Sequence, residues 1–201
     1  MGKLNMNDIK NINILKCFDT LKETSSDKHD GKIPDYMTDS LLNVINFDKV
    51  KDKYIENLSV PETPASNDVL YIDDNKEMYF IEFKNGYMDS KKIFEVRLKI
   101  FDSLLILTDI IKKGVSFTRE ELNYILVYNE TKNPLTDNEI KELRSIELKL
   151  IFAKHFAKKS EKNFIRFSLR RFKTLYFKNV FTLTEDEFKN EFVKKWDNYA
   201  D

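Results

Sequence analysis

Two carboxylates and one lysine at the ends of adjacent predicted strands are the residues best suited to chemistry. Asp68 opens a short apolar segment, and Glu82 and Lys84 end a second one. Side chains alternate along a strand, so Glu82 and Lys84 share one face. If the turn between the strands centres on Asn75, Asp68 lies opposite Glu82 on that face. Burial of ionisable groups is costly unless they are paired or bind a metal, so the cluster is either an ion pair or a site.

The chemistry that this cluster suits is metal-assisted attack on a phosphate. Converging carboxylates provide the oxygen ligands that Mg²⁺ prefers, and Mg²⁺ keeps several waters when it binds. A metal ion there would neutralise charge on the phosphate and make a bound water more acidic. Lys84 would orient or help deprotonate that water, or stabilise the developing negative charge. The expected cofactor is therefore Mg²⁺, with Mn²⁺ as a substitute.

Regular elements on both sides of the cluster would hold it in place. Alternating apolar residues predict strands over residues 68–72 and 77–84, joined by a turn at 73–76. Residues 90–113 show the spacing of a long helix that is apolar on most sides. The run NYILVY (123–128) is almost continuously apolar, as expected for a strand covered on both faces.

The rest of the chain is read mostly as helix. Helical spacing covers residues 8–23, and a second pattern starts at Thr38 or Asp39, runs through Phe47 and continues or restarts to Leu58. Residues 137–155 also read as a helix. After an extended segment at 180–183, Thr184 and Glu187 form a capping-box signature for a last helix to Trp196. This order of elements predicts an α/β layer structure in one domain, residues 1–201.

The spacing of these residues resembles the PD-(D/E)xK, or restriction-endonuclease-like, nuclease superfamily. The resemblance covers about residues 39–130 and rests on Asp68, the hairpin, Glu82-Phe83-Lys84, and the helix and buried strand that follow. It implies a core of helix, three strands, helix and strand, with additional C-terminal helices. By motif position, Asp68 and Glu82 would be metal ligands and Lys84 the catalytic lysine. A further acidic ligand is expected from the preceding helix, with Glu56 as first candidate and Asp52 as second.

Three departures from the family pattern leave the subfamily and substrate open. Asn67 stands before Asp68, where the family has proline, and the helix after Lys84 has no Gln-x-x-x-Tyr element; Glu95 and Lys99 occupy it instead. The first strand of the core is not obvious and would have to lie near residues 58–64, at a sheet edge because of two prolines. The resemblance implies Mg²⁺-dependent cleavage of nucleic acid, with DNA as the expected substrate and a homodimer or protein partner compatible with it.

The C-terminal part of the chain, about residues 137–201, is basic and rich in aromatic residues. The segment RFSLRRFKTLYFK interleaves phenylalanine and tyrosine with Arg166, Arg170, Arg171 and Lys173. Arginine and lysine bind phosphates, and aromatic rings can stack on unpaired bases, so these four residues are candidate nucleic-acid contacts. The aromatic residues are equally well explained as core, with the bases on a solvated face.

Composition excludes several other classes of protein. The 34 basic and 34 acidic residues balance, so net charge favours no partner, and 41% hydrophobic residues exclude a disordered chain. One cysteine excludes an intrachain disulfide and a cysteine-rich zinc site. The N-terminus shows no secretory signal and no apolar run is long enough to span a bilayer, so a soluble, cytoplasmic protein is expected.

Three alternatives to an active nuclease stay open. Asp68, Glu82 and Lys84 could form a cross-strand ion pair on a half-exposed sheet, worth about 0.2–1 kcal/mol. The chain could be a catalytically inactive member of the same fold that acts as a binding module for protein or nucleic acid. It could also be an unrelated α/β protein whose basic lobe binds an acidic partner.

Overall fold

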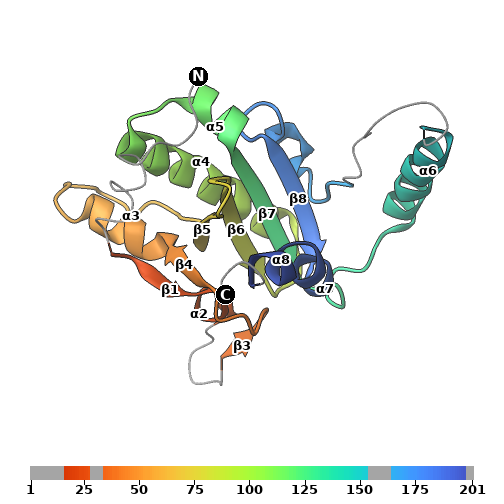
Figure 1. Ribbon diagram of the computed structural model, residues 1–201, viewed down its shortest axis with the longest axis horizontal. Coiled ribbons are helices and arrows are strands. Elements are labelled where there is room, and N and C mark those ends of the chain that lie inside the picture. The colour runs from red at the N-terminus through yellow and green to blue at the C-terminus, as the bar shows by residue number, and fades with distance from the viewer. Residues whose placement is uncertain (1–15, 28–33, 154–163, 198–201) are drawn as a thin grey trace.

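The computed structural model of the chain describes residues 16–27, 34–153 and 164–197 (Figure 1). These residues form an α/β protein built on a six-stranded mixed sheet with the order β1-β4-β5-β6-β7-β8. The strands are β1 (Phe18–Thr20), β4 (Asn43–Asn46), β5 (Val69–Ile72), β6 (Met78–Lys84), β7 (Leu122–Tyr128) and β8 (Asn179–Thr184). A separate two-stranded sheet pairs β2 (Ser26–Asp27) with β3 (Asp35–Tyr36).

The sheet changes direction between its two halves. Strands β1, β4, β5 and β6 are each antiparallel to the next, whereas β7 runs parallel to β6, and β8 runs parallel to β7. The parallel pairing of β6 with β7 requires a crossover connection between them. The long helix α4 (Ser90–Ile111) and the short helix α5 (Val115–Glu121) form this connection. Because β8 pairs with β7, the C-terminal segment belongs to the same sheet as the predicted site.

Helices cover both faces of the sheet (Figure 1). On one face, Phe80 and Tyr124 are buried in a cluster with α3 (Phe47–Ile55), α4 and η1 (Leu169–Phe172). On the other face, Tyr79 and Ile81 lie in a second cluster with Phe188 and Trp196. That second cover consists of α7 (Glu185–Phe188), η2 (Lys189–Val193) and α8 (Lys194–Asp197), with α2 (Leu21–Thr24) beside them. Burial on both faces explains why β6 and β7 are apolar almost throughout.

Three predicted elements agree closely with the structure. The hairpin strands, the long helix and the buried strand NYILVY correspond to β5 and β6, to α4 and to β7. The capping box is also confirmed, because the Thr184 hydroxyl accepts from the Glu187 N–H and the Glu187 carboxylate accepts from the Thr184 N–H. Residues 137–153 of the predicted 137–155 helix form α6 (Asp137–Ala153), and the last two residues lie outside the described ranges.

The predictions for the N-terminal third were wrong in part. Helix was expected through Val50 and Ile55, and α3 confirms it; residues 21–23 of the expected 8–23 helix also lie in a helix, α2. Residues 18–20 of the expected 8–23 helix form strand β1, while residues 8–15 lie outside the described ranges. The helix expected through residues 41–47 is instead strand β4, and helix begins only at Phe47. Val44 and Ile45 fit a helical spacing, but pairing with β1 and β5 decides their conformation. Asn46 ends the strand and caps α3, since its side-chain oxygen accepts from the Lys49 N–H.

No strand lies where the first strand of the core was expected. Residues 58–64 contain no strand, and the antiparallel neighbour of β5 is β4, at residues 43–46. Helix α3 follows β4 and lies between it and β5 in the chain. In the described ranges, no helix is both long enough and apolar enough to cross a bilayer.

Candidate active site

Asp68 and Glu82 lie opposite one another at one end of the β5–β6 hairpin. The register pairs Val69 with Ile81, so its extension by one residue sets Asp68 against Glu82, as the sequence predicted. The Phe83 N–H donates to Oδ2 of Asp68 at 2.7 Å, which fixes the carboxylate beside β6. The Glu82 side chain is fully buried, whereas Asp68 keeps about 16% of its side chain exposed. The pair therefore combines one enclosed carboxylate with one that solvent can reach.

Lys99 of α4 joins the two carboxylates. Its Nζ lies 2.7 Å from Oε1 of Glu82 and 3.1 Å from Oδ1 of Asp68. Lys84 is the second cation, with its Nζ 2.6 Å from the same Oε1 of Glu82. Two carboxylates and two ammonium groups thus meet between the sheet and α4. The carboxylate charges are balanced, which is what makes their burial tolerable.

One oxygen of this cluster is left without a partner. Oε2 of Glu82 is buried and makes no hydrogen bond, although Oε1 of the same carboxylate makes two ion pairs. Close by on the same sheet face, the Tyr124 hydroxyl is also buried without a partner. The side chain of Asn67, next to Asp68, is fully buried with both polar atoms unpaired. Burying a carboxylate oxygen without a hydrogen-bond donor costs free energy. Such an oxygen can be satisfied by a bound cation or by a water.

The electrostatics of the cluster follow from its burial. Burial, together with the neighbouring Glu82 carboxylate, raises the pKa of Asp68 to about 7. Burial alone would lower the pKa of Lys99, but the attraction of Glu82 and Asp68 outweighs it and raises that pKa. Burial also raises the pKa of Tyr124 well above its usual value, and the two carboxylates add to the effect. Strong perturbation of several groups in one place is typical of functional sites.

The structure does not bring Glu56 to the carboxylate pair. Glu56 follows the last residue of α3 and is exposed, and the second candidate, Asp52, is exposed and ion-paired with Lys51. Across the described ranges, no group of three His, Cys, Asp or Glu side chains is arranged to hold a metal ion. The site therefore offers two carboxylates, and the remaining ligands of a cation would have to be waters or substrate oxygens.

Arg166 has a structural role that the sequence did not indicate. Its guanidinium is 5% exposed and donates to Glu139 at 2.8 and 3.0 Å, and to the carbonyl oxygens of Asn133 and Pro134. It also lies over the ring of Tyr128. These contacts join the start of α6 to the sheet. Its donors are used within the chain, which argues against Arg166 as a nucleic-acid contact.

The other three predicted nucleic-acid contacts lie in or beside η1. Arg170 and Arg171 are exposed, and Lys173 is half-buried. Arg170 has its nearest acidic partner, Glu142, at 3.8 Å, and Arg171 lies over the ring of Phe172. Phe172 and Phe177 of the same segment are fully buried, so these aromatic residues are core, as the alternative interpretation held. Exposure leaves the two arginines available to a partner, but they are not among the residues that line the carboxylate cluster.

Lys99 was missed as a site residue, although a signal for it exists in the sequence. Val96, Ile100 and Ser103 form the buried face of α4, and Lys99 falls on this face at helical spacing. A lysine inside the apolar stripe of a covered helix needs an acidic partner.

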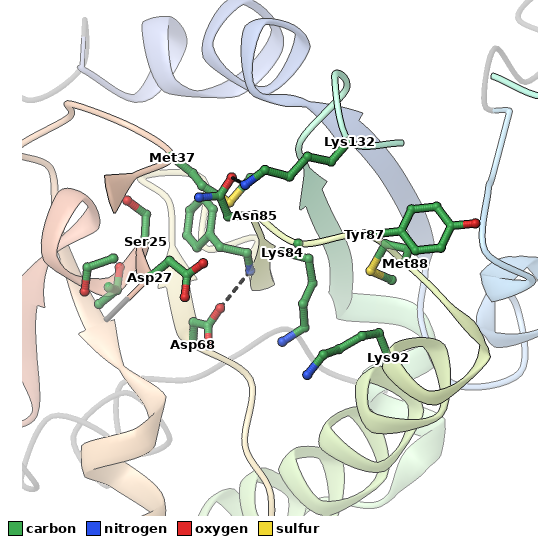
Figure 2. A pocket seen from close by; sticks show the side chains of 14 residues that line it. Ser25, Asp27, Met37, Asp68, Lys84, Asn85, Tyr87, Met88, Lys92 and Lys132 are labelled. Atoms are coloured by element: carbon green, nitrogen blue, oxygen red, sulfur yellow. Dashed lines mark hydrogen bonds between the residues drawn. The ribbon is translucent and has the colours of Figure 1, made fainter. Parts of the chain in front are cut away.

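A cavity of about 320 Å³ opens beside the cluster (Figure 2). Asp68 and Lys84 lie on its wall together with Lys92 from the first turn of α4 and Lys132 from the loop after β7. Residues 24–27, next to and within β2, line the other side. Asp68 is thus reached through a cavity with three lysine side chains on its wall, whereas Glu82 is not among the lining residues.

Comparison of the chain with protein-family models, with curated proteins and with solved structures found no match. The function must therefore be argued from the site itself.

Proposed function

We propose that this chain is a metal-dependent phosphodiesterase of the PD-(D/E)xK type that acts on nucleic acid, with DNA as the expected substrate. The observation that carries the proposal is the meeting of Asp68 and Glu82 from adjacent strands with Lys84 and Lys99. An ordinary cross-strand ion pair needs one cation and one carboxylate at the surface. Here one of the two carboxylates is fully buried, and one of its oxygens has no donor.

The donor set fits Mg²⁺. Magnesium is held in many phosphate-handling sites by one or two carboxylates, with waters and substrate phosphate completing its shell. Asp68 and Glu82 are the two residues that would hold it, and Oε2 of Glu82 is the oxygen free to do so. When bound, the ion supplies Lewis-acid chemistry toward the phosphate group and lowers the pKa of water.

Two lysines of the chain supply fixed positive charge at the site. Lys84 and Lys99 are positioned by Glu82 and Asp68, so their ammonium groups are fixed before substrate arrives. Fixed positive charge next to a reacting phosphate stabilises the negative charge that develops as water attacks phosphorus. Phe80, two residues before Glu82 on β6, and Ile100, next to Lys99 on α4, are fully buried in the core.

The order of elements adds support for the family assignment. Three antiparallel strands, β4, β5 and β6, are followed by α4 and by β7 parallel to β6. This order is similar to the strands, helix and strand of the family core, and the cluster uses the motif residues. Helix α3, however, lies between β4 and β5 instead of before the three strands, which departs from the family order. Asn67 and the absent third carboxylate in the described ranges are departures from the family pattern.

Cleavage of mixed nucleic acids tests the proposal. Purified protein is incubated with single- and double-stranded DNA and RNA in Mg²⁺ or Mn²⁺, beside Lys84→Ala and a control, Lys178→Ala, which removes an exposed ion pair with Glu77. We expect cleavage by the wild type and by Lys178→Ala, and a loss of about 10²–10³-fold in Lys84→Ala. Equal cleavage by all three folded proteins would refute the mechanism.

A second candidate is a catalytically inactive binding module with the same fold. Lys99 favours it, because its ammonium already lies between the two carboxylates where a cation would bind. Calorimetric titration with Mn²⁺ separates the two functions. Heat of binding that disappears in Asp68→Asn supports the enzyme, and an absence of heat in the wild type supports the module.

A further inference from the structure

The cavity beside the carboxylate pair is lined by cations from three separate elements. Lys84 comes from the end of β6, Lys92 from the first turn of α4, and Lys132 from the loop that follows β7. In Figure 2, Lys84 and Lys92 extend toward the lower part of the view, and Lys132 lies at the top beside Asn85. The acidic residues on its wall are Asp27 and Asp68, and Asp68 is already ion-paired with Lys99.

The charge of Lys132 is the one still available to a ligand. Lys84 and Lys92 are ion-paired with Glu82 and Glu95. Lys132 instead donates to Oδ1 of Asn85 at 3.1 Å, a neutral group. The Glu185 carboxylate interacts electrostatically with Lys132, but no ion pair within 4.0 Å joins the two, so most of the ammonium charge remains for an anion.

Asn85 holds that wall of the cavity rigid. Its amide nitrogen donates to Asp35 at 2.8 Å, and its oxygen also accepts from the Asn129 side chain at 2.9 Å. Asn133 joins the same loop to residues 86–88. Its side-chain oxygen accepts from the Met88 N–H, and its side-chain nitrogen donates to the Gly86 carbonyl oxygen. The loop that carries Lys132 is thus fastened to the end of β6, and the ammonium is positioned before a ligand binds.

We propose that this cavity binds a phosphate group of a single nucleic-acid strand, next to the phosphate at the carboxylate pair, with Lys132 as its main contact. This inference rests on the proposed function and specifies its substrate class. About 320 Å³ is at the lower end of the ~300–1,000 Å³ found for small-ligand pockets, which suits one nucleotide unit of a strand. A positively charged groove that follows the backbone is how single strands are bound.

Binding without cleavage tests the proposal. Fluorescence anisotropy is measured with a twelve-nucleotide single-stranded DNA and a blunt duplex of the same sequence, with Ca²⁺ in place of Mg²⁺. Lys132→Ala is compared with Lys194→Ala. The control is matched, because Lys194 is also exposed and also donates to an asparagine oxygen, that of Asn190, outside the cavity.

The expected result is weaker binding of the single strand to Lys132→Ala, by at least about threefold, with Lys194→Ala equal to wild type. Loss of one phosphate contact also reduces the slope of log affinity against log salt by about 0.7 for a single strand. Equal affinity and slope in the two variants, or a duplex bound as tightly as the single strand, would overturn the inference. Cleavage of DNA by the wild type would then still support the proposed enzyme. Conversely, Lys132-dependent binding without cleavage in Mg²⁺ or Mn²⁺ would support the cavity and reject the enzyme.

Discussion

The ammonium of Lys99 lies 2.7 Å from the fully buried carboxylate of Glu82, and this contact joins α4 to the centre of the sheet. The same nitrogen contacts Asp68 at 3.1 Å. The cation therefore balances two carboxylates that would otherwise repel one another in the interior. The stability of the folded chain and the proposed chemistry therefore both depend on Lys99.

Replacement of Lys99 by methionine should destabilise the protein. The change keeps most of the side-chain volume but leaves the buried Glu82 carboxylate with Lys84 as its remaining ammonium partner. Breaking a buried ion pair by removing one partner costs about 3–5 kcal/mol. Urea unfolding in metal-free buffer measures the loss.

Calcium should restore part of that stability if the carboxylates form a metal site. A divalent ion can take the place of the missing ammonium, so the Tm of Lys99→Met should rise more with Ca²⁺ than the Tm of wild type. Lys49→Met, which breaks an exposed ion pair with Asp19, serves as control and should show no such rise. An identical response of all three proteins to Ca²⁺ contradicts a metal site between Asp68 and Glu82.

Glu56→Gln should leave activity nearly unchanged. Glu56 is exposed at the end of α3, whereas Asp68 is ion-paired with Lys99 at the site. Relative to wild type, we expect less than about a twofold change for Glu56→Gln and a loss of about 10²-fold or more for Asp68→Asn. The measurement is the initial rate of DNA cleavage at saturating Mg²⁺. A large loss in Glu56→Gln would mean that α3 supplies a ligand when substrate binds.

Arg166→Ala should reduce stability and Arg170→Ala should not. Truncation of Arg166 leaves the carbonyl oxygens of Asn133 and Pro134 without this donor, at a cost of about 2–3 kcal/mol, while the Glu139 carboxylate keeps its hydrogen bonds from Thr136. Arg170 is 79% exposed, with its acidic partner 3.8 Å away, so its removal should change stability by less than about 0.5 kcal/mol. Urea unfolding of the two variants measures both values. Equal stability would contradict the structural role of Arg166.

The contribution of Glu139 should depend on pH. Burial alone would raise its pKa, but hydrogen bonds from Arg166 and Thr136 outweigh burial and lower it below the ordinary value of 4.5. A carboxyl with a lowered pKa in the folded state stabilises the protein above its unfolded pKa, and the effect is lost as pH falls through the folded value. The stability difference between wild type and Glu139→Gln should therefore be present at pH 7 and shrink below about pH 4.5. A difference that grows on acidification contradicts this sign.

Local patterns in the sequence predicted the central part of the fold. The alternation around Asp68 and Glu82 set the register of the hairpin, because one residue of slip would turn Glu82 to the opposite face. The apolar run NYILVY could be read as a buried strand because β7 is covered on both sides. Asp68, Glu82 and Lys84 thus came together from spacing alone.

Long-range pairing decided what local patterns could not. Val44 and Ile45 have helical spacing with their neighbours, yet both pair with β1, and Ile45 also pairs with β5. Strand β1 has no clear strand pattern in its own sequence, and β5 lies far from these residues in the chain. The partners of Lys99 are 17 and 31 residues away. Likewise, the basic surroundings of Arg166 suggested a ligand contact, whereas its acidic partner Glu139 lies in α6, 27 residues earlier in the chain.

The most direct test compares two glutamates for their effect on DNA cleavage. Glu82→Gln removes the charge of the buried carboxylate, and Glu95→Gln removes that of a more exposed glutamate on α4, paired with Lys92. Both proteins, with folding checked by circular dichroism, are incubated with DNA and Mg²⁺ beside the wild type. The account predicts that Glu95→Gln cleaves like wild type and that Glu82→Gln loses about 10²-fold or more. Cleavage at the wild-type rate by folded Glu82→Gln would contradict it.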